Sequence, residues 1–433
     1  MSGARDHALA RLDALALPAW PPGVMPKTAR RAAWAAPEDP RDRALAEHLY
    51  VGVIKNLLHL QYLLSRLADR NLRSIDPLVQ KITVLGLYQL RFLTRIGPWA
   101  AVDEAVEQAK RLGRRRAAGF VNAVLRKAVH AQAIPLPDRA AQPQLYARDV
   151  LSHPQQLFRR LVALVGVEHA LRLCERNNRE PPTIVRLNAG VPPQALERPE
   201  IRVTPHEQPG MFVVEPAPAA LLADWAARGI AQAQDPTAAL VVEAMELLPG
   251  QVVLDRCCGA GTKTLQIVEK VGPTGLVVAM DPCGARCEML SKVLRDRGIH
   301  NVRVRQAGMI DRLDPADPRV YDRILVDAPC SNSGVLARRP EARYAQSDRT
   351  IVSLTRLQDR ILDDAARALA RGGRLVYSTC SLWPRENRQR IDALLGGHGD
   401  FRLLEQHAQL PSLDAAATCY RDGGYYAVLA RDR

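Results

Sequence analysis

The feature that most constrains the fold is a regular alternation in the second half of the chain. From Gly250 onward, short apolar runs end in polar or glycine-rich turns, and segments with helical periodicity follow them. Strands that alternate with helices are typical of a mostly parallel, doubly wound α/β sheet. We therefore predict a Rossmann-like domain at 241–433. Its expected strands are 252–255, 275–281, 302–304, 324–327 and 375–377, with helices near 263–269 and 350–370.

The first third of the chain has a different pattern, with apolar residues at helical spacing over 42–130. Asp76-Pro77 indicates a helix start, because proline is favoured at the first helical position. We predict an all-helical domain at 1–145, whose last part, 131–145, is a proline-containing linker. Residues 146–240 combine helical and strand-like segments and are expected to form a small α/β subdomain between the two.

Positive charge is concentrated in the helical region. Residues 1–145 contain 22 Lys and Arg against 12 Asp and Glu, a net charge of +10, and the remainder contributes only +4 to the total of +14. This uneven distribution suggests a polyanionic partner, most often a nucleic acid. The cluster Arg114-Arg115-Arg116 is the candidate contact. Charge alone is equally consistent with a solvated basic face.

No segment indicates a membrane or secretory protein. No apolar run approaches the ~18 residues of a membrane helix. Asp6, Asp13 and several prolines interrupt the stretch where a signal peptide would lie. We therefore expect a cytoplasmic protein whose 8 cysteines are mostly thiols. The cysteines lack the spacing of a zinc site, to which Cys283 and Cys287 come closest, so no bound metal is expected.

The turn after the first predicted strand has features of a cofactor site. Gly259 and Gly261 follow Asp255 where the backbone would pass close to a ligand, and Asp281 ends the second strand. A carboxylate at that position can bind ribose hydroxyls, which indicates a dinucleotide or S-adenosylmethionine. The phosphate-binding loop of nucleotide triphosphatases is absent from the sequence. Glycine turns after strands are common, so this pattern is weak by itself.

Two cysteines stand just after the fourth and fifth predicted strands, Cys330 after 324–327 and Cys380 after 375–377. Ligands bind at the carboxyl ends of strands in open α/β sheets, so both thiols can face one pocket. Taken singly, each would more often be a buried small hydrophobe. Methylation of carbon 5 of a pyrimidine uses such groups. A thiolate adds to carbon 6, an acid stabilises the charge that develops on the ring, and a base removes the proton at carbon 5. The pair therefore favours S-adenosylmethionine over a dinucleotide.

The two cysteine motifs closely resemble the signatures of the Sun-family RNA 5-methylcytosine methyltransferases. The first is Asp327-Ala328-Pro329-Cys330-Ser331-Asn332-Ser333-Gly334 followed by Arg338-Arg339-Pro340-Glu341, and the second is Tyr377-Ser378-Thr379-Cys380-Ser381-Leu382-Trp383-Pro384 with Glu386-Asn387. Residues 40–130, and 120–126 in particular, are similar to the NusB-type RNA-binding domain of the RsmB-like branch, which acts on small-subunit rRNA. Residues 185–188 and 234–236 resemble the family's pre-catalytic elements, so the resemblance covers nearly the whole chain.

The resemblance implies a role for each motif residue. Cys380 would be the nucleophile on carbon 6, Cys330 would assist product release, and Asp327 would contact the ring or the methionine part of the cofactor. Asp281 would bind the ribose. The cofactor loop would consist of Cys257, Cys258, Gly259, Ala260, Gly261, Thr262 and Lys263, with Gly308 near the adenine. Apart from the resemblance, we expect RNA contacts from Arg186 and from the basic cluster Arg114, Arg115 and Arg116. The implied cofactor is S-adenosylmethionine, and the implied partner of a monomeric enzyme is 16S rRNA or a small-subunit assembly intermediate.

The chain departs from the family pattern in the cofactor loop. The family usually has Ala-Ala-Pro-Gly-Gly-Lys, so Ala260 and Thr262 replace its proline and second glycine. Gly308 stands where the family has an acid, and Asp311 lies three residues further on. One alternative is therefore a non-catalytic RNA-binding assembly factor with a degenerate cofactor loop. A DNA cytosine methyltransferase is disfavoured, because that chemistry resembles a nucleophile in the Pro-Cys motif and lacks both a second Thr-Cys motif and a helical RNA-binding domain.

Overall fold

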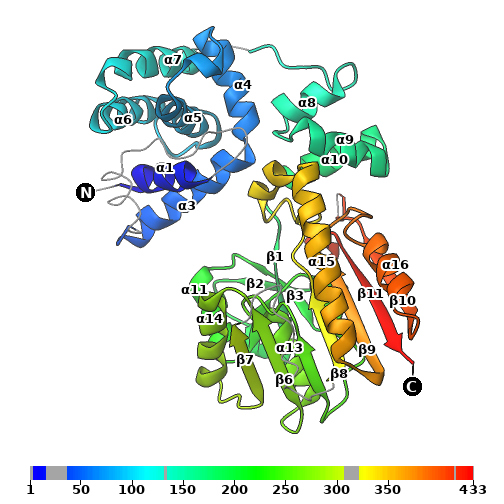
Figure 1. Ribbon diagram of the computed structural model, residues 1–433. Coiled ribbons are helices and arrows are strands. Elements are labelled where there is room, and N and C mark those ends of the chain that lie inside the picture. Colours follow the sequence, from blue (N-terminus) through cyan, green and yellow to red (C-terminus); the bar gives the residue numbers. More distant parts are fainter. Residues whose placement is uncertain (1–2, 16–36, 131–133, 307–320, 414–415, 433) are drawn as a thin grey trace. The chain divides into compact units, whose positions relative to one another are not determined.

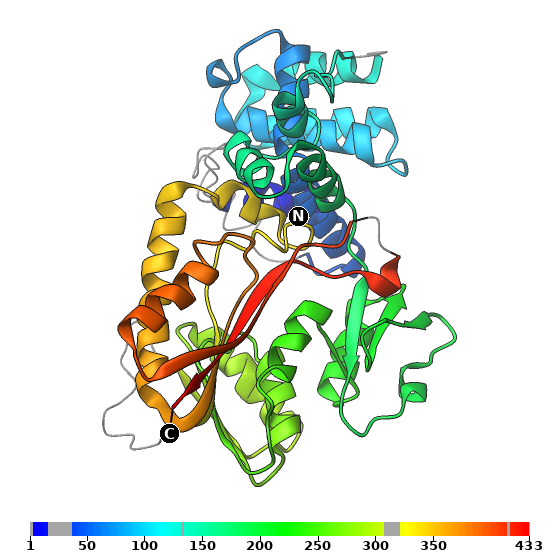
Figure 2. The ribbon, with the colours of Figure 1, turned by 90° about the vertical axis from the view of Figure 1, so that its right-hand side faces the viewer.

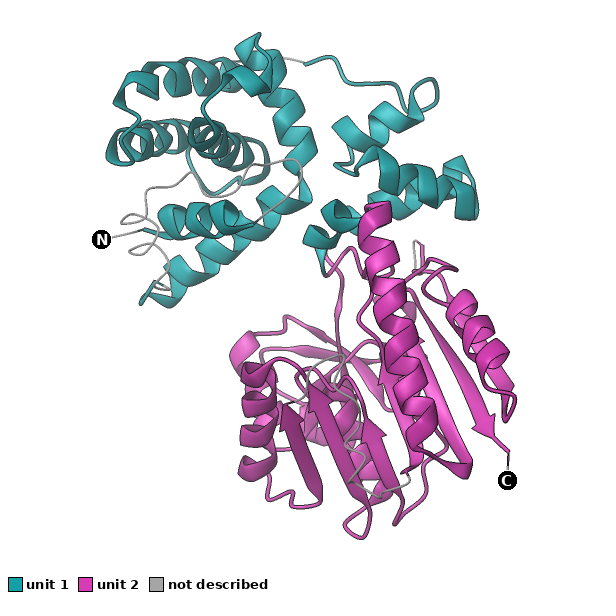
Figure 3. Ribbon diagram, viewed as in Figure 1, with its two compact units in different colours: residues 1–179, 339–346 teal, residues 180–338, 347–433 magenta. Residues whose placement is uncertain are grey.

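The computed structural model describes residues 3–15, 37–130, 134–306, 321–413 and 416–432. The chain divides into two compact units (Figure 3). Unit 1 comprises residues 1–179 and 339–346, and unit 2 comprises residues 180–338 and 347–433. The three-domain division remains a proposal, since contacts group residues 146–179 with the helical unit. Within the described ranges, no helix is both long and apolar enough to cross a membrane.

Unit 1 is built from helices, seen in Figure 1. They are α1 (Ala4–Ala14), α3 (Pro40–Lys55), α4 (Leu57–Ala68), α5 (Pro77–Phe92), α6 (Pro98–Arg111), α7 (Ala118–His130), α8 (Pro143–Asp149), α9 (Gln155–Val165) and α10 (Val167–Asn178), with 3₁₀ turns η1 (Leu72–Ser74), η2 (Arg115–Ala117) and η4 (Pro340–Ala345). The Asp76 carboxylate accepts hydrogen bonds from the N–H groups of Leu78 and Val79 at the start of α5. The predicted helix start at Asp76-Pro77 is therefore present. The apolar faces of α1 and of α3 to α7 share one hydrophobic core, to which Tyr344 of η4 also belongs.

Residues 339–346 belong to unit 1 although the chain on both sides of them belongs to unit 2. The fully buried Arg343 side chain donates hydrogen bonds to the carbonyl oxygens of Lys55 and Asn177 and to the side-chain oxygen of Asn178. Three acceptors from two helices thus hold one guanidinium. This network explains why a short segment from the middle of the sequence packs with the N-terminal helices.

Unit 2 is organised around a seven-stranded sheet with the order β10-β11-β9-β8-β5-β6-β7. Its strands are β5 (Val252–Asp255), β6 (Leu276–Asp281), β7 (Val302–Gln306), β8 (Tyr321–Asp327), β9 (Leu369–Thr379), β10 (Phe401–Gln409) and β11 (Gly424–Arg431). Strands β5 to β9 run parallel to one another. The predicted doubly wound α/β class is therefore confirmed. The antiparallel strands β10 and β11 were not predicted.

Helices cover both faces of this sheet, which explains why its central strands are almost wholly apolar. The helices are α12 (Pro236–Glu243), α13 (Thr262–Val271), α14 (Gly284–Asp296), α15 (Asp348–Ala368) and α16 (Arg388–Gly397). Successive residues of a strand point to opposite faces, so Leu254 packs in the core beneath α15 and α16. Its neighbour Val253 packs in the core beneath α12 and α13. Figure 2 shows the sheet of unit 2 turned by a quarter from the view of Figure 1.

A smaller antiparallel sheet precedes the large one in unit 2, with the order β2-β3-β1-β4. Its strands are β1 (Thr183–Leu187), β2 (Arg202–Pro205), β3 (Met211–Glu215) and β4 (Ala231–Ala233), and helix α11 (Ala219–Ala227) packs beside it. Trp225 of α11 is fully buried in the core of this part. The strand that was predicted at 183–188 is thus present as β1.

The order of the large sheet reverses between β5 and β8. From β5 the chain continues outward through β6 and β7, whereas β8 and β9 lie on the other side. Ligands of open α/β sheets bind at the carboxyl ends of strands at such a switch point. Strand β5 ends at Asp255, just before the glycine turn, and β8 ends at Asp327, just before Cys330. The topology therefore brings the predicted cofactor turn and the first cysteine motif to one edge.

Candidate active site

The register of β8 and β9 brings Cys330 and Cys380 together. In this parallel pair Asp327 lies opposite Ser378, and the N–H of Ala328 donates to the carbonyl of Ser378 at 2.8 Å. Strands β8 and β9 therefore end at the same level of the sheet. The sulfur atoms of Cys330 and Cys380 lie 3.1 Å apart. The two predicted cysteines therefore lie side by side at the carboxyl edge of the sheet.

The two thiols differ in their surroundings. The hydrogen bond to Cys380, together with burial, raises the pKa of Cys330 well above its ordinary value. Cys330 thus keeps a proton that it can donate to the neighbouring sulfur. Burial lowers the pKa of Lys263, but Asp327 and Cys380 outweigh it and raise that pKa. Lys263 therefore keeps its positive charge beside the cysteine pair.

Asn332 completes the contacts of Cys380 and was not predicted as a site residue. Its φ of +57° lies in the left-handed region, which asparagine tolerates better than most residues. Its Nδ2 donates to the carbonyl of Cys330 at 3.1 Å, and its Oδ1 accepts from the Sγ of Cys380 at 3.0 Å. A carbonyl can only accept a hydrogen bond, so this carbonyl fixes the orientation of the amide. Only the place of Asn332 within the motif could have drawn attention to it.

The carboxylate of Asp327 is held by two donors. Its Oδ2 lies 2.6 Å from the Nζ of Lys263, and its Oδ1 accepts from the hydroxyl of Ser378 at 2.7 Å. Lys263 belongs to α13, directly after the glycine turn, whereas Ser378 belongs to β9. Asp327 therefore links the cofactor turn to the cysteine pair with a fixed orientation.

Glu386 connects the two cysteine loops through hydrogen bonds to both. Its side chain is fully buried, and its Oε1 accepts from the N–H of Ser331 at 2.9 Å and from Nε2 of Gln358 at 3.2 Å. Its Oε2 accepts from the hydroxyls of Ser331 and Ser381 at 2.5 and 2.6 Å. Ser331 and Ser381 each directly follow one of the cysteines. The sequence placed Glu386 in a motif but gave it no role.

The turn between β5 and α13 has a backbone that glycine adopts easily, with φ of +56° at Gly259 and +91° at Gly261. A Cβ on Gly261 would lie 2.3 Å from a methyl carbon of Leu290, whereas the space beside Gly259 is open. The Gly259 N–H donates to Oδ2 of Asp281 at 3.0 Å, and the Cys283 N–H donates to Oδ1 at 2.9 Å. Asp281 therefore faces the turn, and each of its oxygens keeps a lone pair for a further donor.

Asp255 presents an unsatisfied acceptor in the same turn. Its Oδ2 accepts from the hydroxyl of Thr264 at 2.7 Å, while its buried Oδ1 has no partner within the described residues. Burial raises the pKa of Asp255 to about 7. A buried acceptor without a donor costs about 1–3 kcal/mol, so it suits a ligand that brings a donor. The ammonium of an amino-acid moiety is such a donor, and the turn therefore fits the predicted S-adenosylmethionine.

The other residues of the predicted cofactor loop have different surroundings. Cys257 and Cys258 are buried in apolar clusters, and burial raises the pKa of both thiols. Ala260 is exposed, and Thr262 is the first residue of α13. Gly308, predicted near the adenine, lies outside the described residues. Of this loop, the glycines and Lys263 are the parts whose geometry suits a ligand.

The predicted RNA-binding cluster lies at η2 of unit 1. Arg115 and Arg116 are exposed, and the half-buried Arg114 forms an ion pair with Asp76, with 3.1 Å between Nε and Oδ2. Two of the three guanidinium groups thus face solvent without a carboxylate within salt-bridge distance in the described part of the chain. This arrangement is compatible with phosphate binding, which remains a prediction.

Arg186 has a different environment from that cluster. It is buried, its Nη1 lies 2.7 Å from Oε2 of Glu269, and its Nε donates to Oε1 of Gln234 at 2.9 Å. These bonds tie β1 of the small sheet to α13 of the large one. The geometry gives Arg186 a structural contact inside unit 2, and an RNA contact by this residue stays untested.

Comparisons with known proteins agree on one family. A family model described as 16S rRNA methyltransferase RsmB/F matches residues 242–420, and the NusB family model matches residues 21–130. The "Ribosomal RNA small subunit methyltransferase B" of Sodalis glossinidius is 33% identical over 411 residues, covering 92% of both chains. The solved structure of PH0851 has a TM-score of 0.77 at 20% identity and covers 99% of this chain and 98% of its own. The structure of NSun6 from Pyrococcus horikoshii with SFG has a TM-score of 0.53 at 18% identity, covering 65% of this chain and 98% of its own.

Proposed function

Because the chain belongs to the RsmB/F family of 16S rRNA methyltransferases, we propose that it methylates carbon 5 of a cytosine in 16S rRNA through a covalent bond between Cys380 and carbon 6. Its cofactor is S-adenosylmethionine, which supplies an activated methyl group when bound. The observation that carries the proposal is the 3.1 Å contact between the sulfurs of Cys330 and Cys380 beside the Asp327–Lys263 ion pair. Two buried small hydrophobes would have no need of a neighbouring ammonium or of directed hydrogen bonds.

In this proposal the Cys380 thiolate forms a bond to carbon 6 of the cytosine. The electron pair of the C5–C6 double bond is displaced toward the ring nitrogen, so carbon 5 becomes nucleophilic and takes up the methyl group. A base then removes the proton from carbon 5. The electron pair of that C–H bond restores the double bond, and the bond between carbon 6 and sulfur breaks.

The role of Cys330 follows from its raised pKa. A thiol that stays protonated is a poor nucleophile but a competent hydrogen-bond donor. Its S–H lies where it can donate to the sulfur of Cys380. Such a bond stabilises the thiolate as it leaves carbon 6, so we assign product release to Cys330 and attack to Cys380.

Asp327 and Lys263 form the charged edge of the proposed site, and the 2.6 Å ion pair fixes both groups. Asp327 would contact the ring or the methionine part of the cofactor, and Lys263 would stabilise negative charge on the ring when the thiolate adds. On the cofactor side, Asp281 would hold the ribose and Asp255 the amino group. In this assignment, unit 1 binds RNA and the protein acts as a monomer.

Bisulfite sequencing tests the proposal directly. Purified protein is incubated with S-adenosylmethionine and either naked 16S rRNA or small-subunit particles, and one cytosine should become resistant to conversion. Cys380→Ala serves as the matched control and should protect no cytosine. Calorimetry with the cofactor tests the rival reading. Undetectable binding at millimolar cofactor in the presence of RNA would favour a non-catalytic assembly factor.

A further inference from the structure

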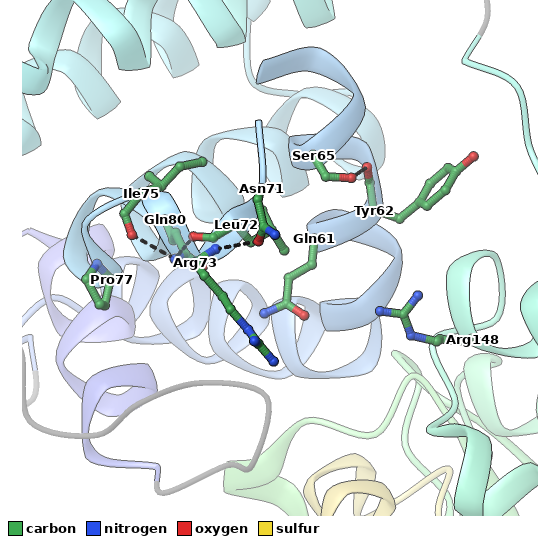
Figure 4. A pocket seen from close by; sticks show the side chains of 10 residues that line it. All are labelled: Gln61, Tyr62, Ser65, Asn71, Leu72, Arg73, Ile75, Pro77, Gln80 and Arg148. Atoms are coloured by element: carbon green, nitrogen blue, oxygen red, sulfur yellow. Dashed lines mark hydrogen bonds between the residues drawn. The ribbon is translucent and has the colours of Figure 1, made fainter. Parts of the chain in front are cut away.

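Unit 1 contains a pocket with a mixed polar and apolar lining that the proposed chemistry does not use. It has a volume of about 680 Å³ and lies among α4, η1, the start of α5 and α8 (Figure 4). Leu72, Ile75 and Pro77 contribute apolar surface, and Arg73 and Arg148 contribute charge. Small-molecule sites commonly have volumes of roughly 300–1,000 Å³, so the pocket has room for a nucleotide.

The guanidinium groups of Arg73 and Arg148 have N–H donors that can bind a ligand. Arg73 is exposed and has no carboxylate within salt-bridge distance among the described residues. Arg148 is also exposed and uses Nη1 to contact Oδ1 of Asp149 at 2.7 Å. A guanidinium has five N–H donors, so one contact leaves Arg148 most of its capacity. In Figure 4 both side chains extend toward the side of the pocket where Gln61 lies.

The turn that carries Arg73 is held in place by its neighbours. The buried side chain of Gln80 donates from Nε2 to the carbonyls of Leu72 and Ile75, at 2.7 and 2.9 Å. The side-chain oxygen of Asn71 accepts from the N–H of Arg73 at 3.0 Å. Arg73 is therefore presented by a fixed backbone and not by a loose loop. A pre-positioned cation loses less entropy when it binds an anion.

Positive charge continues beyond the pocket. Arg66 lies over the ring of Tyr62, a lining residue, at 5.2 Å. The Arg114 ion pair is made with Asp76, the residue before the lining Pro77. The pocket thus opens next to the basic cluster of η2. Its surroundings favour an extended polyanion over a small neutral ligand.

We propose that this pocket binds a nucleotide of single-stranded RNA, with Arg73 and Arg148 on its phosphate and the exposed amide of Asn71 on the edge of its base. Bidentate guanidinium–phosphate bonds supply affinity, and an amide carries both a donor and an acceptor for a base edge. The inference rests on the proposed function in that unit 1 binds RNA, and it deepens that assignment by naming the pocket and the residues that hold one nucleotide.

The test uses the full-length protein and a fluorescein-labelled single-stranded RNA of mixed sequence, with affinity measured by anisotropy over a range of salt concentrations. Arg73→Gln and Arg148→Gln should each weaken binding at least fivefold. Each should also reduce the slope of log affinity against log salt by roughly 0.7, the value for one phosphate contact to a single strand. Arg73→Lys should keep the salt slope but recover only part of the affinity, because an ammonium keeps the charge and loses the bidentate geometry. Both arginines are exposed, but Arg148→Gln removes the ion-pair partner of the buried Asp149, so circular dichroism checks that each variant folds.

The matched control is Arg41→Gln, which removes the same charge from unit 1 at an exposed position near the start of α3. It should change affinity less than twofold. If Arg73→Gln and Arg148→Gln weaken binding no more than this control, or if polyglutamate competes as well as RNA, the pocket is not an RNA site. Methylation of 16S rRNA is assayed in parallel. If the wild type methylates 16S rRNA but the pocket variants bind RNA as well as it does, this inference is wrong and the proposed function stands. If the pocket variants bind RNA more weakly but the wild type does not methylate, the proposed function is wrong and this inference stands.

Discussion

The side-chain oxygen of Asn332 lies 3.0 Å from the sulfur of Cys380, while the amide nitrogen of Asn332 is bound to the carbonyl of Cys330 at 3.1 Å. Together with the contact between the two sulfurs, these bonds form a closed ring of hydrogen bonds, called the circuit below. Cys330 donates to Cys380, Cys380 donates to Asn332, and Asn332 donates to the backbone of Cys330. In this resting arrangement the Cys380 sulfur carries a proton that points at Asn332, and the circuit must open before the sulfur attacks.

Asn332→Gly is expected to make Cys380 more reactive. Glycine keeps the left-handed backbone conformation and removes the acceptor that holds the S–H proton. One neutral hydrogen bond is worth about 1 kcal/mol, so alkylation of the Cys380 peptide by iodoacetamide should become about fivefold faster. Mass spectrometry of the alkylated peptide at one fixed pH measures this rate without RNA. Asn332→Asp should slow alkylation, because a carboxylate beside the sulfur opposes a thiolate. Identical rates for all three proteins would remove Asn332 from the mechanism.

The cysteine variants should differ in what they trap. Cys380→Ala cannot form the bond to carbon 6, so methylation and any covalent protein–RNA complex should both vanish. Cys330→Ala can still attack and methylate but should release RNA poorly, and a species that survives denaturing electrophoresis should accumulate when cofactor and RNA are present. The double variant should show none. If only Cys380→Ala accumulated the covalent protein–RNA species, the roles of the two cysteines would be the opposite of those proposed.

The parts of the site that could be predicted from the sequence are those encoded by local pattern. An apolar run that ends in Asp327 or in Ser378-Thr379 marks the end of a strand, and parallel strands end at one edge. The contacts of Asn332 and Glu386 could not be predicted from the sequence. They join segments about fifty residues apart, and the left-handed backbone of Asn332 is confined to that one residue. Neither leaves a periodic signal.

Strand β10 and the environment of Arg186 were missed for related reasons. Most residues of Phe401–Gln409 are exposed, and the register with β11 shifts between Leu403 and Glu405, so this edge strand lacks the alternation that marks a half-buried one. Arg186 stands in an apolar strand, and its partner Glu269 lies far along the chain. Arg186 was expected to contact RNA, whereas its burial and its ion pair with Glu269 could only be seen in three dimensions.

Asp281→Ala should weaken cofactor binding by about 1.5–3 kcal/mol, the usual scale for a hydrogen bond to a charged group. The variant also removes the acceptor of the Gly259 and Cys283 N–H groups, which shape the turn. Asp281→Asn is the matched control, since its oxygen can retain one of these bonds, and its loss should be smaller. Isothermal titration with S-adenosylmethionine measures both. Equal binding by wild type and Asp281→Ala would show that the ribose is held elsewhere.

Glu386→Ala should lower the free energy of unfolding by about 3 kcal/mol, because it leaves the buried Ser331 N–H without its acceptor and removes the carboxylate to which the Ser331 and Ser381 hydroxyls donate. Gln358 still donates to the carbonyl of Pro329. Glu386→Gln should be much milder. Its oxygen can still accept from the Ser331 N–H, and the two serine hydroxyls can turn to accept from its amide. Urea denaturation of the three proteins compares these energies, and methylation shows whether the cysteine loops keep their spacing. A Gln variant as damaged as the Ala variant would mean that the negative charge itself is required.

The raised pKa of Asp255 predicts opposite pH dependences for stability and for cofactor binding. Its folded pKa of about 7 lies above the unfolded value near 3.9, so its contribution to stability is fully present below about pH 4 and is lost as pH rises through 7. Burial and Asp422 also raise the pKa of Asp235 to about 7, and for this reason the effect must be isolated by comparing wild type with Asp255→Asn. Wild type should gain more thermal stability than the variant when pH falls from 8 to 5.

Cofactor binding should respond in the other direction, because an ammonium group needs the ionised carboxylate. Below the pKa, the ionised fraction of Asp255 falls about tenfold per pH unit, so wild-type affinity for S-adenosylmethionine should decline by up to that factor between pH 6 and pH 5. It should level off above about pH 7.5. Asp255→Asn should bind more weakly at pH 8 and show a flatter profile. Titration calorimetry at four pH values resolves the two curves. A wild-type affinity that does not change across this range would mean that the orphaned oxygen of Asp255 does not meet the amino group of the cofactor.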